Sequence, residues 1–164
     1  MKKLFSVLAV LFVLGTVNVF ALGIGPQGGT TPGGAAGAGG LTLKIDGVPC
    51  VFGVTAEFGT GFTSVGVTAD WWIANPKIER TWGYYYGVGL AGSINVGDAG
   101  GDMFAGGRIL VGTNVFLLNN FIELYLQAAW EPGIIIYSNS NANNSGIAFN
   151  PNRVPVNVGL RFWF

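Results

Sequence analysis

The sequence from position 41 onward alternates between apolar and small or polar residues with a period of two. In the stretch 62–73, FTSVGVTADWWI, every second residue from Val65 to Ile73 is apolar, whereas the residues between them include Thr68 and Asp70. Successive side chains of a β-strand point to opposite faces, so alternation sustained over many residues predicts strands. Eight segments show it: 41–45, 50–58, 62–73, 82–91, 105–115, 122–131, 134–137 and 154–164.

The charged residues of these segments all fall on one face. That face also carries the Gly, Thr, Asn and Gln residues, and the opposite face is almost wholly Val, Leu, Ile, Ala and aromatic. The charged residues concerned are Lys44, Glu57, Asp70, Arg108, Glu123, Glu131 and Arg161. Each predicted strand therefore has one apolar face and one small, polar or charged face.

Two architectures produce such a pattern. In a soluble barrel of lipocalin type the apolar face points inward, and in a transmembrane barrel it meets lipid while the polar face lines the lumen. Three features favour the transmembrane barrel. The longer apolar segments have about ten residues, the length at which a tilted strand crosses the hydrocarbon, and the other face is too rich in glycine for a sheet surface in water. Aromatic residues also gather at the strand ends, with Trp71, Trp72 and Trp82 predicted at one rim and Phe58, Phe62, Trp130, Phe162 and Phe164 at the other.

The segments before position 41 differ from the barrel pattern. Lys2 and Lys3 precede an apolar run, and Val19-Phe20-Ala21 has the form of a cleavage site, so residues 1–21 are predicted to be a secretory signal peptide. Residues 22–40 have glycine at nearly every second position, and we expect them to be a flexible leader. Residues 41–164 would then form a single all-β domain, an antiparallel up-and-down transmembrane barrel of about eight strands.

The chain ends in VNVGLRFWF, with Leu160, Phe162 and Phe164 in one apolar row. A signal peptide, alternating strands and a terminal phenylalanine together resemble the bacterial outer-membrane β-barrels. The strand count makes the chain similar to the small OmpA- and OmpX-type barrels, and to small spirochaetal barrels of unknown function. The resemblance implies export to the outer membrane, where lipid surrounds the barrel. It also implies that the terminal aromatic row is the signal read by the barrel-assembly machinery.

The resemblance further implies that both ends of the barrel domain lie in the periplasm. The turns 59–61 and 131–133 and the looser segment 94–102 would then be periplasmic. The segments 46–49, 74–81, 117–120 and 138–153 would lie outside the cell, and the last of these, which is rich in asparagine, would be the longest external loop.

The predicted lumen is narrow, because side chains alone fill an eight-stranded barrel. Charges placed there need partners, since an unpaired buried charge is very costly. We therefore expect Lys44, Arg108 and Arg161 to pair with Glu57, Asp70, Glu123 and Glu131 in a network that plugs the lumen, with bulk added by Tyr85, Tyr125 and Trp163.

Other kinds of chemistry find little support in the sequence. The chain has no histidine, the commonest general base, and its one cysteine cannot form a zinc site, so we expect no catalytic activity, no cofactor and no metal. The motif GVGLAG at 87–92 matches GxGxxG, but a glycine-rich segment follows it instead of the helix that nucleotide binding requires. The charges of eight basic and eight acidic residues cancel. The sequence has no basic patch of the kind that binds nucleic acids.

The sequence thus predicts a non-enzymatic outer-membrane barrel. Its role would be structural or adhesin-like, with a possible surface ligand bound through the external loops. Two alternatives stay open at this stage: a narrow channel for small or apolar solutes, and a soluble lipocalin-like ligand-binding barrel.

The face assignment yields a direct test in the last strand. Val158→Arg would place a charge against lipid, at a cost of about 2–4 kcal/mol near the bilayer midplane, and should block folding into bilayers. Arg161→Gln changes the lumen face and should fold while loosening the network. Folding into lipid vesicles, followed by the heat-dependent gel shift of the folded barrel, measures both. Normal folding of Val158→Arg would show that the two faces are assigned the wrong way round.

Overall fold

A computed structural model describes residues 21–30, 37–59, 61–98, 100–139 and 144–164. The signal peptide predicted for residues 1–21 lies outside this range except for Ala21. The described residues form ten β-strands. They are β1 (Leu22–Thr30), β2 (Ala38–Ile45), β3 (Cys50–Gly59), β4 (Phe62–Ala74), β5 (Trp82–Gly97), β6 (Gly100–Leu117), β7 (Ile122–Trp130), β8 (Gly133–Asn139), β9 (Asn144–Asn150) and β10 (Val156–Trp163).

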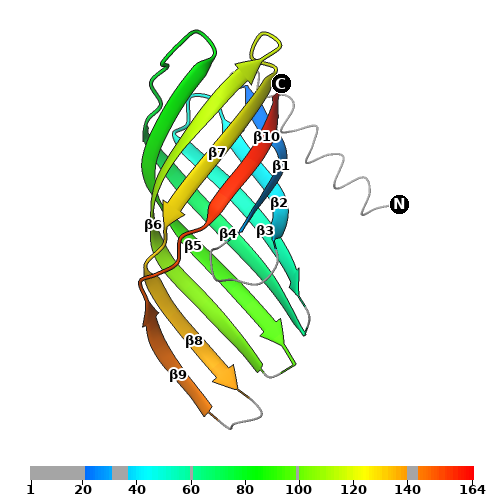
Figure 1. Ribbon diagram of the computed structural model, residues 1–164, viewed down its shortest axis with the longest axis vertical. Coiled ribbons are helices and arrows are strands. Elements are labelled where there is room, and N and C mark those ends of the chain that lie inside the picture. The colour runs from blue at the N-terminus through cyan, green and yellow to red at the C-terminus, as the bar shows by residue number, and fades with distance from the viewer. Residues whose placement is uncertain (1–20, 31–36, 60, 99, 140–143) are drawn as a thin grey trace, which may run out of the picture.

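Eight of these strands close into an antiparallel barrel, as the sequence predicts. Around the barrel the order is β5-β4-β3-β2-β1-β10-β7-β6, and pairing between β5 and β6 completes the ring. The first strand pairs with the last, because β10 lies between β1 and β7 (Figure 1). Closure gives every barrel strand a partner on both sides and leaves no open edge within the ring.

The strands are staggered as well as closed. Stepping from partner to partner from Tyr84 on β5 leads through all eight strands and returns to β5 at Ile94, ten residues further along. A stagger of this size tilts the strands by about 40° from the barrel axis. The tilt brings side chains that are distant in the sequence to the same height in the lumen.

The prediction that residues 22–40 form a flexible leader is wrong for the described part of that segment. Leu22–Thr30 is strand β1, and β2 begins at Ala38, three residues before the predicted start of the barrel domain. The glycines allow large groups of the neighbouring strand to lie against β1. A Cβ atom at Gly23 would meet the Trp163 ring. Backbone pairing with β2 and β10 on both sides offsets the entropy of ordering the segment.

The region after β7 also differs from the prediction. Residues 131–133 form no turn, because β8 follows β7 along successive parts of the same strand, β6. The backbone N–H of Gly107 donates to the Pro132 carbonyl at 3.1 Å at the break. The predicted external loop 138–153 contains β9, which pairs with β8. The β8–β9 hairpin therefore extends the wall beyond the ring, as Figure 1 shows.

A second hairpin extends in the same direction. The segment 94–102, predicted as a loose turn, is mostly strand, since β5 runs to Gly97 and β6 starts at Gly100. These two strands have 16 and 18 residues and are the longest in the barrel. Together with β8 and β9 they make one end of the molecule much taller on one side.

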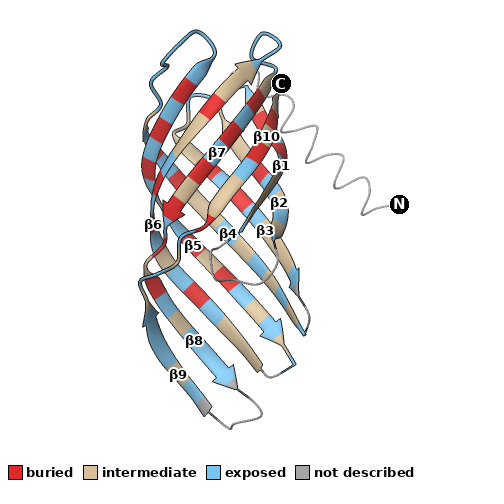
Figure 2. Cartoon of the chain, in the orientation of Figure 1, coloured by how far each residue is buried: buried red, intermediate tan, exposed pale blue. Residues whose placement is uncertain are grey.

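Burial confirms the predicted faces. Val158 and Leu90 are 59% and 69% exposed on the outer surface, whereas Arg161 and Glu123 are 1% and 0% exposed inside the barrel. Buried and exposed residues alternate along the strands in Figure 2. The apolar face thus points outward and the charged face inward, which is the reverse of the lipocalin-like alternative.

Three residues are assigned wrongly to the aromatic rims. Trp72 is buried in the lumen, because it lies on the same face of β4 as Thr68 and Asp70. Phe162 and Phe164 lie at the same end as the turn 118–121, where both pack against Phe121 with ring centroids 5.9 Å apart. Of the remaining members of the second rim, Phe58 and Phe62 flank the β3–β4 turn at the opposite end, and Trp130 is the last residue of β7.

Candidate functional site

The lumen contains two layers of ion pairs, and the first lies near the end that carries Leu22 and Phe164. The Arg161 guanidinium on β10 donates through Nη1 to Glu123 on β7 at 3.1 Å and through Nε to the Thr42 hydroxyl on β2 at 3.1 Å. The same carboxylate accepts bonds from Asn114 and from the Trp163 indole, at 2.8 and 3.1 Å. Glu123 is fully buried, yet its charge is compensated and hydrogen-bonded.

The second layer is centred on Arg108 of β6. Its Nε lies 2.8 Å from Asp70 Oδ1 on β4, and its Nη1 contacts Glu131, which follows β7. Glu131 also accepts a bond from Arg153 Nε at 2.7 Å. Two arginines therefore balance two carboxylates in this layer, and all of these side chains except Arg153 are nearly inaccessible to water.

Aromatic side chains fill the space between the layers. Trp72 stacks on Tyr85 with centroids 3.8 Å apart, and the Tyr85 hydroxyl donates to Gln127, whose amide donates to Asp70 at 3.2 Å. Tyr125 donates to Gln27 at 2.9 Å. The Arg161 guanidinium lies 4.1 Å from the centre of the Tyr125 ring.

Glycines on neighbouring strands make room for these rings. A Cβ at Gly112 would overlap the Tyr85 ring, and a Cβ at Gly159 would overlap the Tyr125 ring. The inward glycines therefore accommodate the bulky plug and leave little open space.

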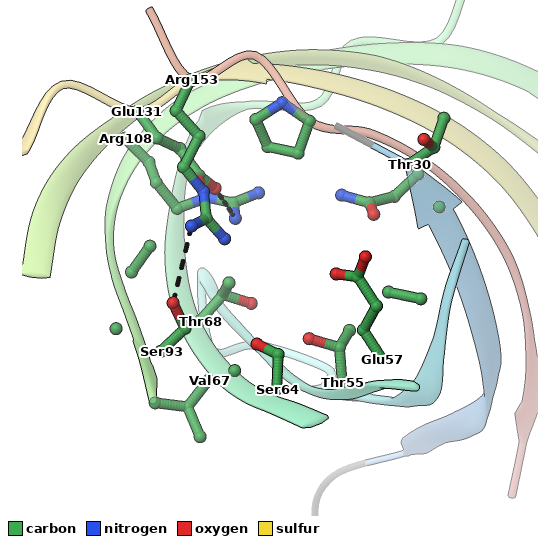
Figure 3. Close-up of a pocket in the computed structure, with 17 residues that line it drawn as sticks. Thr30, Thr55, Glu57, Ser64, Val67, Thr68, Ser93, Arg108, Glu131 and Arg153 are labelled. Atoms are coloured by element: carbon green, nitrogen blue, oxygen red, sulfur yellow. Dashed lines mark hydrogen bonds and ion pairs between the residues drawn. The ribbon is translucent and has the colours of Figure 1, made fainter. Parts of the chain in front are cut away.

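A small cavity lies beyond the Arg108 layer, on the side of the extended hairpins. It has a volume of about 60 Å³, room for a few water molecules. Hydroxyl side chains of Thr55, Ser64 and Ser93 line it, and Figure 3 shows Glu57 and Arg153 pointing into it from opposite sides. The Arg108–Glu131 pair is part of its lining, and a void of about 20 Å³ lies beyond Arg108, between the two layers.

The structure separates the seven charged residues predicted for the lumen into two groups. Five of them join the ion pairs: Asp70, Arg108, Glu123, Glu131 and Arg161. Lys44 and Glu57 also face inward, but neither makes an ion pair with any described residue. Lys44 lies near the mouth beside Leu22, and Glu57 lines the small cavity at the other end.

Sequence reasoning did not identify Arg153, Thr42, Asn114 and Gln27 as site residues. Arg153 falls in a segment of asparagine, glycine and proline that resembles a loop, and no period-two pattern surrounds it. The inward position of Thr42 was visible in its alternation with Leu41 and Leu43, but its contact with Arg161 depends on strand stagger.

The row of Leu160, Phe162 and Phe164, predicted as the assembly signal, faces outward. Phe164 is exposed, and Leu160 and Phe162 are half-buried.

Among the described residues, no group of three or more histidine, cysteine, aspartate or glutamate side chains is arranged to hold a metal ion. The same residues include no helix long and apolar enough to cross a membrane.

Comparisons with known proteins identify a distant structural similarity only. No protein-family model matches the chain, and no curated protein matches it significantly in sequence. Among solved structures, a major outer membrane protein from Thermus thermophilus superposes with a TM-score of 0.43 and 13% sequence identity. The match covers 88% of this chain and 99% of that one.

Arg108 and Arg153 both pair with Glu131, but we expect their removal to lower the free energy of unfolding by different amounts. Arg108→Met leaves Asp70 and Glu131 buried without their main partner and should lower the free energy of unfolding by about 3–5 kcal/mol. Arg153→Met removes a side chain that is 30% exposed, and its cost should be about 1 kcal/mol or less. Urea unfolding in lipid vesicles measures both. Equal losses for the two variants would contradict the central position of Arg108.

Proposed function

We propose that the protein is a non-enzymatic integral outer-membrane barrel whose lumen is plugged, with a structural or surface-interacting role. The observation that carries this proposal is the distribution of side chains across the wall. Large apolar residues cover the outside of the closed barrel, and ion pairs fill the inside. A polar interior with an apolar exterior suits a protein whose solvent is hydrocarbon.

The outer surface supports lipid as the partner. Exposed Val, Leu and Ile side chains follow one another along the outward rows of β3, β4, β5, β6 and β7. In water such a surface would exceed the apolar patches of ordinary monomers and would cause association. In this proposal the outward row of Leu160, Phe162 and Phe164 contacts lipid and is read by the barrel-assembly machinery.

The interior supports a role without transport. The Arg161 and Arg108 layers and the Trp72–Tyr85 stack lie in series along the lumen. Asp70, Glu123 and Glu131 are each paired with a guanidinium, an arrangement that compensates their buried charge. The small cavity is bounded by the Arg108–Glu131 pair, and the void between the two layers has a volume of only about 20 Å³.

Conductance across a planar bilayer tests the plugged lumen. Residues 22–164, refolded in detergent and inserted, should give a folded barrel without discrete openings. The double variant Arg161→Ala, Glu123→Ala removes the first layer and serves as a control for detecting current through a loosened lumen. Reproducible openings of the unaltered chain would favour the narrow-channel alternative and overturn the plug. The heat-dependent gel shift confirms folding in each case.

The structure changes the proposed orientation. Leu22 and Phe164 pair with each other at the end that also carries the turns 46–49, 75–81 and 118–121 (Figure 1). If this end is periplasmic, as in the barrels that the chain resembles, those turns face the periplasm. The hairpins β3–β4, β5–β6 and β8–β9 then extend from the cell surface, where a surface ligand would meet them.

Cysteine labelling of intact bacteria tests localisation and orientation together. In a Cys50→Ser background, Ser145→Cys on β9 should react with a membrane-impermeant maleimide. Glu79→Cys, in the turn at the opposite end, should react only after the outer membrane is permeabilised. Both side chains are exposed, so differences in burial do not explain a difference in labelling. The reverse pattern would overturn the orientation, and no labelling of either variant in intact cells would overturn surface exposure.

A further inference from the structure

The mouth of the barrel beside Leu22 holds two lysines whose charges are not balanced by the lumen network. In that network Glu123 is the one carboxylate of the first layer, and it forms its ion pair with Arg161. Lys44 on β2 and Lys77 in the turn 75–81 make no ion pair with any described residue, and both line one cavity of about 400 Å³. This volume is within the range of sites for small molecules.

Aromatic rings hold both ammonium groups at this cavity. Lys44 Nζ lies 5.0 Å from the Trp72 ring centre and 5.5 Å from that of Trp163. Lys77 Nζ lies 6.0 Å from the centre of Phe116. The Phe116 and Trp163 rings are neighbours, with centroids 6.3 Å apart. The lysines thus flank a pair of contacting rings that forms the apolar wall of the cavity.

The other residues that line the cavity indicate the charge of the ligand it would bind. Asp46 is the one carboxylate among the lining residues, against the two lysines, and Asn75 and Asn120 add neutral amides that can donate hydrogen bonds. The Lys44 ammonium is half-buried and has no ion-pair partner among the described residues, although Glu123 and Asp46 act on its charge from a distance. An anion entering the mouth would supply a direct counter-charge, and an organic body would cover the rings.

We propose that this mouth is a binding site for a small organic carboxylate. The carboxylate lies between Lys44 and Lys77, the amides of Asn75 and Asn120 complete its hydrogen bonds, and the apolar part of the ligand packs on Phe116 and Trp163. This site goes beyond the proposed structural role. It needs only the folded barrel and depends on neither the orientation nor the absence of conductance.

Binding of 4-fluorobenzoate to the folded chain in detergent tests the site by ¹⁹F NMR. We expect saturable binding that weakens as salt is raised. The neutral analogue 4-fluorobenzamide, which has the same shape, should bind at least about tenfold more weakly because it lacks the charge. Absence of saturable binding of the carboxylate, or equal binding of the amide, would overturn the proposal.

Matched variants locate the binding. Lys44→Met and Lys77→Met keep the aliphatic stem and remove the charge, and each should weaken 4-fluorobenzoate binding about tenfold. Arg80→Met removes a charge from the same turn but outside the cavity lining, and should change affinity less than about twofold. Lys77 is exposed, so its variant tests the site even if Lys44→Met fails to fold. Unchanged binding in Lys77→Met contradicts the site.

Competition with inorganic phosphate distinguishes a site for organic carboxylates from a site for anions in general. Phosphate should displace 4-fluorobenzoate only weakly, because it cannot cover the Phe116 and Trp163 rings. Displacement at equal concentration would overturn the assignment to an organic carboxylate. The gel shift of each variant shows that a lost affinity reflects the mouth and not an unfolded barrel.

Discussion

The ion pairs of Arg108 and Arg161 are the interactions on which the rest of the interior depends. Side chains alone fill an eight-stranded barrel, so a charge inside it has little access to water and must find its partner within the wall. Arg108 joins β4, β6 and the residue after β7, and Arg161 joins β10, β7 and β2. These contacts tie together strands that are not all neighbours in the sheet. The aromatic rings and the inward glycines then fill the space that the two layers leave.

The sequence predicted the faces of the barrel because alternation is a property of each strand by itself. Glu123 and Arg161 could be placed inside, and Val158 outside, from the residues beside them. The partners of the charges depend on the stagger between strands, which no single strand encodes. Lys44 and Glu57 illustrate the difference, since both were correctly expected on the inner face but make no ion pair with a described residue.

The number of barrel strands was predicted correctly, but β1 and β9 were not predicted as strands, because both contain few alternating apolar residues. Residues 22–30 carry mostly glycine on their inner face, where the Trp163 ring of the next strand lies against Gly23 and Gln27 is the one long side chain. β9 begins with Asn144 and Ser145, residues that are common in loops. One barrel strand precedes position 41, and β8 continues in the direction of β7. The two ends of the barrel are therefore the reverse of those predicted.

The contact between Arg161 and Thr42 has a consequence for how the protein folds. The two residues are 119 positions apart, and Arg161 lies in the last strand. If the barrel assembles in a membrane, as we propose, then until β10 enters between β1 and β7 Glu123 lacks its cation and the sheet has two open edges. Both are unfavourable in hydrocarbon. Closure of the seam and neutralisation of the charge therefore occur in the same step. In that setting an intermediate without β10 in place would be unstable, and the dominance of such distant contacts predicts slow, all-or-none assembly.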